Sequence, residues 1–219
     1  MADGLVESAA KSTAPDDPRV AGVAPAEVIA NCDQTNLGRV KVRLPWLPDY
    51  EPWARVAAPM AGMKSGAYFM PQVGDEVLVA FNRGEVLEAY VVGSMWNGRN
   101  KTPVESSTDA ESKWVLKTPK GHELVFDDVA ASITITHVGG PHVTLREASI
   151  EVAMDAKNTA AITFDKSGNV TIKASASITL DAPTINVSAS QNLALGGSSS
   201  ARIDGGGYCS IQATKIDIG

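Results

Sequence analysis

Aromatic side chains are scarce in this sequence, and cysteine is almost absent. Phe, Trp and Tyr make up 5% of the 219 residues, although hydrophobic residues amount to 44%. Because large aromatic rings usually supply much of a compact core, we expect cores built from Ala, Val, Ile and Leu. The two cysteines, Cys32 and Cys209, form neither a disulfide framework nor a zinc-binding pattern. This cysteine usage is typical of assembly in a reducing cytoplasm.

Long hydrophobic runs and an excess of basic residues are missing as well. No stretch of about 18 apolar residues occurs, so the sequence predicts no transmembrane helix. The N-terminal residues lack the apolar segment of a signal peptide. The formal net charge is -6, and an acidic chain gains no counterion-release energy from nucleic acid. General binding of DNA or RNA is therefore disfavoured.

Motifs that carry catalysis or cofactor binding are also missing. No nucleophile elbow, P-loop or dinucleotide fingerprint occurs. Adjacent carboxylates such as Asp127 and Asp128 would point to opposite faces of a strand, so they cannot face one substrate together. His122, His137 and His142 form no His-x-His pattern, and we expect the last two to lie exposed beside a glycine-rich turn. The sequence thus predicts no enzyme activity, no cofactor and no metal site.

Between residues 19 and 98 the sequence contains short runs of β-type composition, separated by Gly, Pro and Asn. The run 38–44 alternates apolar with basic residues, which indicates a half-buried strand. Several such runs within one short segment predict a small closed β-barrel such as an OB-fold. The runs are 28–30, 38–44, 53–57, 74–81 and 89–94.

Two segments border this barrel region. Residues 1–18 are rich in Ala, Ser, Asp and Pro and cannot bury apolar area, which predicts a flexible arm. Residues 99–116 are rich in Asn, Thr, Ser and Glu, which predicts a linker.

From residue 117 to residue 219 the sequence repeats short apolar pairs separated by a polar residue. The pairs that begin at Val170, Ile178, Ile185 and Leu193 follow one another at seven or eight residues, which is an internal repeat. A strand this short with one apolar face cannot form a core by itself. Eight extended residues span about 26 Å, which suits one side of a triangular prism.

Three identical chains would supply the three sides of such a prism. The fold class predicted for the whole chain is therefore all-β, with an N-terminal OB-fold barrel at 19–98. An intertwined, trimeric triple-stranded β-helix follows at 117–219, with its apolar pairs directed to the three-fold axis. An ordinary β-sandwich with irregular strands is the alternative for this second region.

Four segments resemble a known family. Residues 38–46 (GRVKVRLPW), 71–81 (PQVGDEVLVAF) and 93–97 (GSMWN) resemble the OB-fold domain of phage baseplate assembly protein V and of the type VI secretion spike VgrG. Residues 118–128 (TPKGHELVFDD) are similar to the segment that starts the β-helix of these spikes. The resemblance implies a collar seated on a hub, a β-helical needle, and a contractile sheath that drives the needle through a bacterial envelope.

The chain also departs from parts of that family. Some relatives carry a lysozyme domain after the OB-fold, but here only residues 99–116 lie between barrel and needle. VgrG proteins begin with a large hub domain, where this sequence has only the arm at 1–18. We therefore expect a structural spike of a phage, a pyocin-like particle or a related injection system, with the hub as a separate protein. It would be assembled in the bacterial cytoplasm and lie at the tail tip.

Two sets of residues are candidate binding surfaces. Ile216, Ile218 and Gly219 would leave an apolar prism end with open strand edges, which invites a cap. We expect a tip protein of the PAAR-repeat type there. The basic residues Arg39, Lys41 and Arg43 share one strand face, and we expect them to contact the hub, the acidic arm or a neighbouring protomer.

Other functions remain open from the sequence. The basic strand face is compatible with an OB-fold that binds single-stranded nucleic acid. A trimeric adhesin or tail fibre that binds a receptor is a second alternative, and a wall hydrolase is a third.

Overall fold

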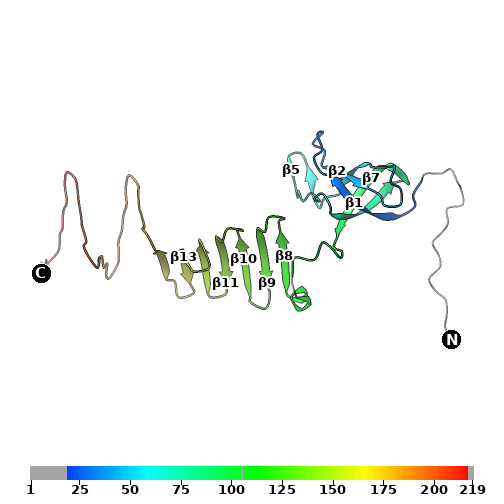
Figure 1. Cartoon of the computed structure of the whole chain (residues 1–219). Helices are drawn as coiled ribbons and strands as arrows, with labels where there is room; N and C mark the ends of the chain where they lie inside the picture. Colours follow the sequence, from blue (N-terminus) through cyan, green and yellow to red (C-terminus); the bar gives the residue numbers. More distant parts are fainter. Residues whose placement is uncertain (1–18, 105, 217–219) are drawn as a thin grey trace, which may run out of the picture. The chain divides into compact units, whose positions relative to one another are not determined.

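The structure is a computed structural model that describes residues 19–104 and 106–216. The chain divides into two compact units, Met1–Val138 and Gly139–Gly219. Figure 1 shows the course of the chain. The predicted arm at 1–18 and the residues Ile218 and Gly219 lie outside the described residues.

The first unit contains a closed barrel with the strand order β1-β2-β3-β7-β6. Neighbouring strands run antiparallel, except that β3 and β7 are parallel. The finding confirms the predicted small β-barrel and the all-β fold class. The barrel strands are β1 (Val23–Ala30), β2 (Arg39–Arg43), β3 (Trp53–Val56), β6 (Glu76–Asn82) and β7 (Glu85–Met95).

Alternation along the strands fills the barrel. Val40 and Val42 of β2 are fully buried, as are Val77 and Val79 of β6, because every second side chain of a strand points inward. The remaining core residues are Ala and Val with one Leu and one Phe. A small closed barrel has little interior volume, which explains the scarcity of aromatic residues.

The turn between β6 and β7 depends on a glycine. Arg83 and Gly84 both have positive φ angles, of 52° and 88°, as a two-residue type I′ turn requires. Val20 donates its backbone N–H to the carbonyl of Gly84 at 2.9 Å. A Cβ atom at Gly84 would lie 2.9 Å from the Cβ of Arg19. The residues before β1 are thereby held against this turn.

A small hairpin lies between β3 and β6 in the chain. It consists of β4 (Ala61–Gly62) and β5 (Ser65–Gly66), which pair antiparallel. A Cβ atom at Gly66 would lie 2.6 Å from the carbonyl oxygen of Met60. Only glycine therefore allows the two sides of the hairpin to approach this closely.

The first unit also contains an antiparallel meander of three strands. A 3-10 helix, η1 (Ser107–Glu111), precedes β8 (Lys113–Lys117), so the meander starts inside the segment that the sequence predicts to be a linker. The other two strands are β9 (Glu123–Asp127) and β10 (Ser132–Thr136).

The second unit begins with an antiparallel meander of four strands. They are β11 (His142–Arg146), β12 (Ser149–Ala153), β13 (Ala160–Asp165) and β14 (Val170–Ala174). A carboxylate closes the turn after β13. Asp165 accepts hydrogen bonds from the backbone N–H groups of Ser167 and Asn169, at 2.8 and 3.0 Å. The side-chain amide of Asn169 and these N–H groups lower the pKa of Asp165.

Residues 175–216 form no strand, and every one of them is exposed. Their apolar side chains, such as Ile178, Ile185 and Leu195, therefore have no cover within the described part of this one chain. Among the described residues, no helix is long and apolar enough to cross a membrane.

Candidate interaction surfaces

The first surface is the apolar side of strands β8–β10. Strand register places Trp114, Phe126 and Ile133 directly opposite one another, and side chains at every second position share a face. A second apolar row therefore lies beside the first on the same face. Its members are Leu116, Leu124 and Ile135.

Strands β11–β14 carry two apolar rows of the same kind. Each row takes one residue from each strand, and the residues of a row lie directly opposite one another. The intervening positions form a polar row: Thr144, Glu151, Thr163 and Thr171. One apolar row consists of Val143, Val152, Ile162 and Ile172, and the other of Leu145, Ile150, Phe164 and Val170. The apolar rows of the two meanders, β8–β10 and β11–β14, are called the apolar face of each meander.

The apolar face is uncovered in the single chain. Trp114 is 71% exposed and Ile172 is 55% exposed, whereas Val40 of the barrel core is fully buried. An apolar surface of this extent is a binding surface or an aggregation site. A strand meander with one apolar face gains stability only when that face packs against something else. The segment is thus incomplete without a partner.

The C-terminal candidate surface lies largely outside the described residues. Ile216 is 54% exposed, and Ile218 and Gly219 are not described. The predicted binding of a tip protein at this end stays a prediction.

Arg39, in the basic strand face, is held by a carboxylate of its own chain. Its Nε and Nη2 atoms donate to the two carboxylate oxygens of Asp33 at 3.0 and 2.9 Å, and Nη2 also donates to the hydroxyl of Thr35 at 2.8 Å. The guanidinium lies 5.8 Å from the ring centre of Trp53. The hydrogen bonds from Arg39, and next those from Thr35, hold the pKa of Asp33 well below its usual range.

Lys41 and Arg43 are paired as well. The Nζ of Lys41 lies 2.9 Å from a carboxylate oxygen of Glu51, and the Nε of Arg43 lies 3.5 Å from the other oxygen. Arg43 also approaches Glu27, at 3.7 Å. The hydrogen bond from Lys41, and then the charge of Lys41, lower the pKa of Glu51. These pairs neutralise the basic strand face locally, so it offers little net positive charge to a phosphate backbone.

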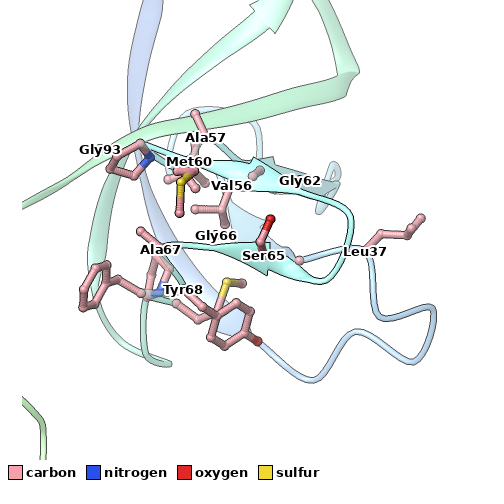
Figure 2. A pocket seen from close by; sticks show the side chains of 18 of the residues that line it. Leu37, Val56, Ala57, Met60, Gly62, Ser65, Gly66, Ala67, Tyr68 and Gly93 are labelled. Atoms are coloured by element: carbon pink, nitrogen blue, oxygen red, sulfur yellow. The ribbon is translucent and has the colours of Figure 1, made fainter.

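The sequence did not reveal a third surface, on the barrel. An apolar groove of about 740 Å³ lies between the β4–β5 hairpin and the ends of β3 and β7, and Figure 2 shows it from close by. Four large apolar residues of this region are mostly exposed: Met60, Met63, Tyr68 and Phe69. The sequence does hold one sign of this surface: the four apolar residues lie within the ten residues 60–69, which contain a single charged residue, Lys64.

The histidines and cysteines give no metal site among the described residues, where no group of three or more His, Cys, Asp or Glu side chains could hold an ion. His137 is exposed as expected, and its ring lies tilted against that of His122, with ring centroids 4.5 Å apart. His142, expected in an exposed loop, instead begins β11 and is half-buried. Both cysteines are exposed thiols.

Two family models match the chain. Residues 24–96 match the type VI secretion system/phage-baseplate injector OB domain. Residues 113–195 match the phage baseplate V C-terminal trimerisation domain. The first range contains nearly all of the barrel, and the second contains the apolar faces of both meanders.

Three curated relatives are VgrG proteins, two of them named as spike proteins. Type VI secretion system spike protein VgrG3 of Vibrio cholerae is 36% identical over 113 residues, 46% of this chain. Spike protein VgrG5 of Pseudomonas aeruginosa is 35% identical over an equal length. A third relative, 31% identical over 110 residues, is actin cross-linking toxin VgrG1 of Vibrio cholerae. The aligned part covers 11%, 14% and 10% of these three relatives, respectively.

Proposed function

Since the chain belongs to the family of phage baseplate V and type VI secretion spike proteins, we propose that it is the central spike of a contractile phage tail or phage-like injection system. The spike lies under the baseplate hub at the tail tip. It is driven through a bacterial envelope when the sheath contracts. Its function is mechanical, and it performs no catalytic step.

The uncovered apolar face carries this proposal. Trp114, Ile162 and Ile172 are exposed in the single chain, and they lie within the segment that matches a trimerisation domain. Three copies that turn their apolar faces inward would bury these rows around a common axis. Strands of neighbouring copies would also supply partners to residues 175–216, which form no strand in the described chain.

A spike of this construction suits penetration. Strands that wrap around one axis have hydrogen-bonded neighbours above and below, so unpaired edges remain only at the two ends. The polar row of β11–β14 includes Thr171, which is exposed, and Thr163, which is half-buried, and in the trimer this row would face solvent along the shaft. The shaft therefore transmits axial force without exposing apolar surface.

The partners follow from the two ends. We place the hub at the barrel, where Arg39, Lys41 and Arg43 keep partly exposed side chains despite their ion pairs. A PAAR-type tip protein caps the other end, at Ile216, Ile218 and Gly219. The spike assembles in the bacterial cytoplasm before the particle is complete.

Sedimentation of the purified full chain tests the proposal. We expect an elongated trimer of 22.9-kDa chains that resists SDS. A compact monomer would contradict it. Filter binding of single-stranded DNA at low salt and zymography on cell walls should both give no signal, because the nucleic-acid binder and wall hydrolase are the competing functions.

The tip is tested separately by deleting residues 214–219. This deletion should abolish co-purification of a co-expressed PAAR-type tip protein while the trimer remains. Retained binding by the shortened trimer would rule out this end as the docking site.

A further inference from the structure

The β4–β5 hairpin presents an exposed apolar side chain that does not line its own groove. Met63 lies at the hairpin tip, between β4 and β5, and is 93% exposed. Its neighbours Gly62, Lys64 and Ser65 line the groove beneath the hairpin, but Met63 does not. A long, flexible thioether that is so exposed is well suited to fill an irregular apolar cavity.

The groove beside the hairpin is such a cavity. Val56 and Ala57 at the end of β3 line its wall, and Gly93 of β7 lies in the same lining (Figure 2). A Cβ atom at Gly93 would meet no atom within 4 Å. The volume of the groove, about 740 Å³, is ample for one methionine side chain and the tip of a hairpin.

We infer that Met63 of one copy of this chain docks in the groove of a neighbouring copy, so that three barrels join in a ring. The inference rests on the trimer of the proposed function and adds to it a specific barrel-to-barrel contact. Each barrel contributes one hairpin tip and one groove. A head-to-tail contact of this kind forms a closed ring of three when each copy is rotated by one third of a turn relative to the next. In that ring, every hairpin tip occupies a groove and every groove is filled.

A second copy is the occupant that the chain itself favours. β7 ends at Met95 and β8 begins at Lys113, so the segment between barrel and trimerisation domain spans at most about 60 Å. Three barrels tethered to one trimer therefore experience an effective mutual concentration in the millimolar range. The segment 60–69 carries a single charge, on Lys64, so charge repulsion between copies is small.

Cysteine cross-linking in the full chain tests this contact. Met63→Cys and Gly93→Cys are combined in a chain whose native thiols are removed by Cys32→Ser and Cys209→Ser. Under mild oxidation, we expect covalent dimers and trimers on a non-reducing gel. The single variants Met63→Cys and Gly93→Cys should stay monomeric on the gel. In the proposed ring, the hairpin tips of two copies do not contact each other, and neither do two grooves.

A matched control combines Met63→Cys with Glu85→Cys, since Glu85 is exposed on the same barrel and does not line the groove. It should give no covalent oligomer. Sedimentation of each preparation before oxidation distinguishes failure of the ring from failure of the trimer. If the chain is a trimer but the cysteines at positions 63 and 93 form no disulfide between copies, the proposed ring of barrels is wrong and the proposed spike function stands. A disulfide that forms only within one chain has the same meaning. Absence of the trimer overturns the proposed function itself.

Discussion

The barrel and the apolar face use one sequence pattern with opposite outcomes. In both regions, apolar and polar residues alternate along short strands. The barrel closes on itself, and Val40 and Val79 are fully buried inside it. The strands β11–β14 form an open meander, and Ile162 and Ile172 remain 39% and 55% exposed. Local patterning therefore sets the faces, while closure decides whether one chain is sufficient.

This difference separates two kinds of stability. The barrel core is complete within one chain, so a barrel released from the trimer should stay folded, and its free energy of unfolding should then not depend on protein concentration. The apolar face is completed by other copies, so its stability should rise with concentration, as for any oligomer. Substitutions in the two regions should therefore have different consequences for assembly and for barrel stability.

The largest effect is expected from Ile172→Asp. Ile172 belongs to an apolar row, and in the trimer each copy would bury a carboxylate, at a cost of several kcal/mol unless the group is neutralised. We expect the chain to sediment as a monomer while the barrel remains folded. Thr171→Asp is the matched control, because Thr171 is the adjacent residue on the opposite, polar row. An Ile172→Asp trimer as stable as the unsubstituted one would refute inward packing of the apolar face.

The second effect is expected from Leu44→Ala in the barrel. Leu44 is fully buried, and truncation of a buried leucine typically costs about 2–5 kcal/mol. Trp46 packs edge-on against Phe81, with ring centroids 6.4 Å apart. In a chain that also carries Ile172→Asp and Trp114→Phe, which does not assemble and lacks the tryptophan of the apolar face, tryptophan fluorescence therefore reports on the barrel. The urea midpoint of this signal should fall by the same amount at low and high protein concentration. A concentration-dependent midpoint would show that the barrel is not self-sufficient.

A third, smaller loss of barrel stability is expected from Gly84→Ala. The positive φ of Gly84 strains an L-residue by about 1–2 kcal/mol, and the added Cβ would press on Arg19 and Val20. Gly98→Ala serves as control, because a Cβ atom there meets nothing within 4 Å. Thermal unfolding followed by Trp fluorescence should show a lower midpoint for Gly84→Ala alone. Equal midpoints would mean that the turn relaxes at no cost.

The sequence was sufficient to predict the barrel, because each strand carries its own alternation and its own turn residues. Arg83 and Gly84 are an example: they lie between the predicted strand runs 74–81 and 89–94, where a turn joins β6 and β7 in the structure. The periodic apolar pairs beyond residue 117 likewise predicted one apolar face per strand. Trimerisation followed from the physical requirement that such faces be covered, and the matched trimerisation domain supports it.

Features that depend on distant contacts could not be predicted in this way. The strand Arg39–Arg43 reads as a basic face, yet its cations are paired with Asp33, Glu27 and Glu51 from other segments. The groove beside the β4–β5 hairpin also needs β3 and β7 to form its wall. Register and turn chemistry are local, whereas ion pairing and grooves arise only after the chain has folded.

The smallest effect is expected from Asp33→Asn, which should change how the stability of the barrel depends on pH in the acid range. The hydrogen bonds from Arg39 and Thr35 lower the pKa of Asp33 in the folded chain. A carboxylate with a lowered folded-state pKa stabilises the fold above its unfolded-state pKa of about 3.9, and this contribution is lost as the pH falls further. Asp33→Asn should therefore lower barrel stability at neutral pH and flatten its decline below about pH 4. Asp49→Asn is the control, a carboxyl with no ion pair among those found in the described residues. Parallel stability-versus-pH curves for the unsubstituted chain and Asp33→Asn would show that the Asp33–Arg39 pair contributes nothing to the stability of the barrel.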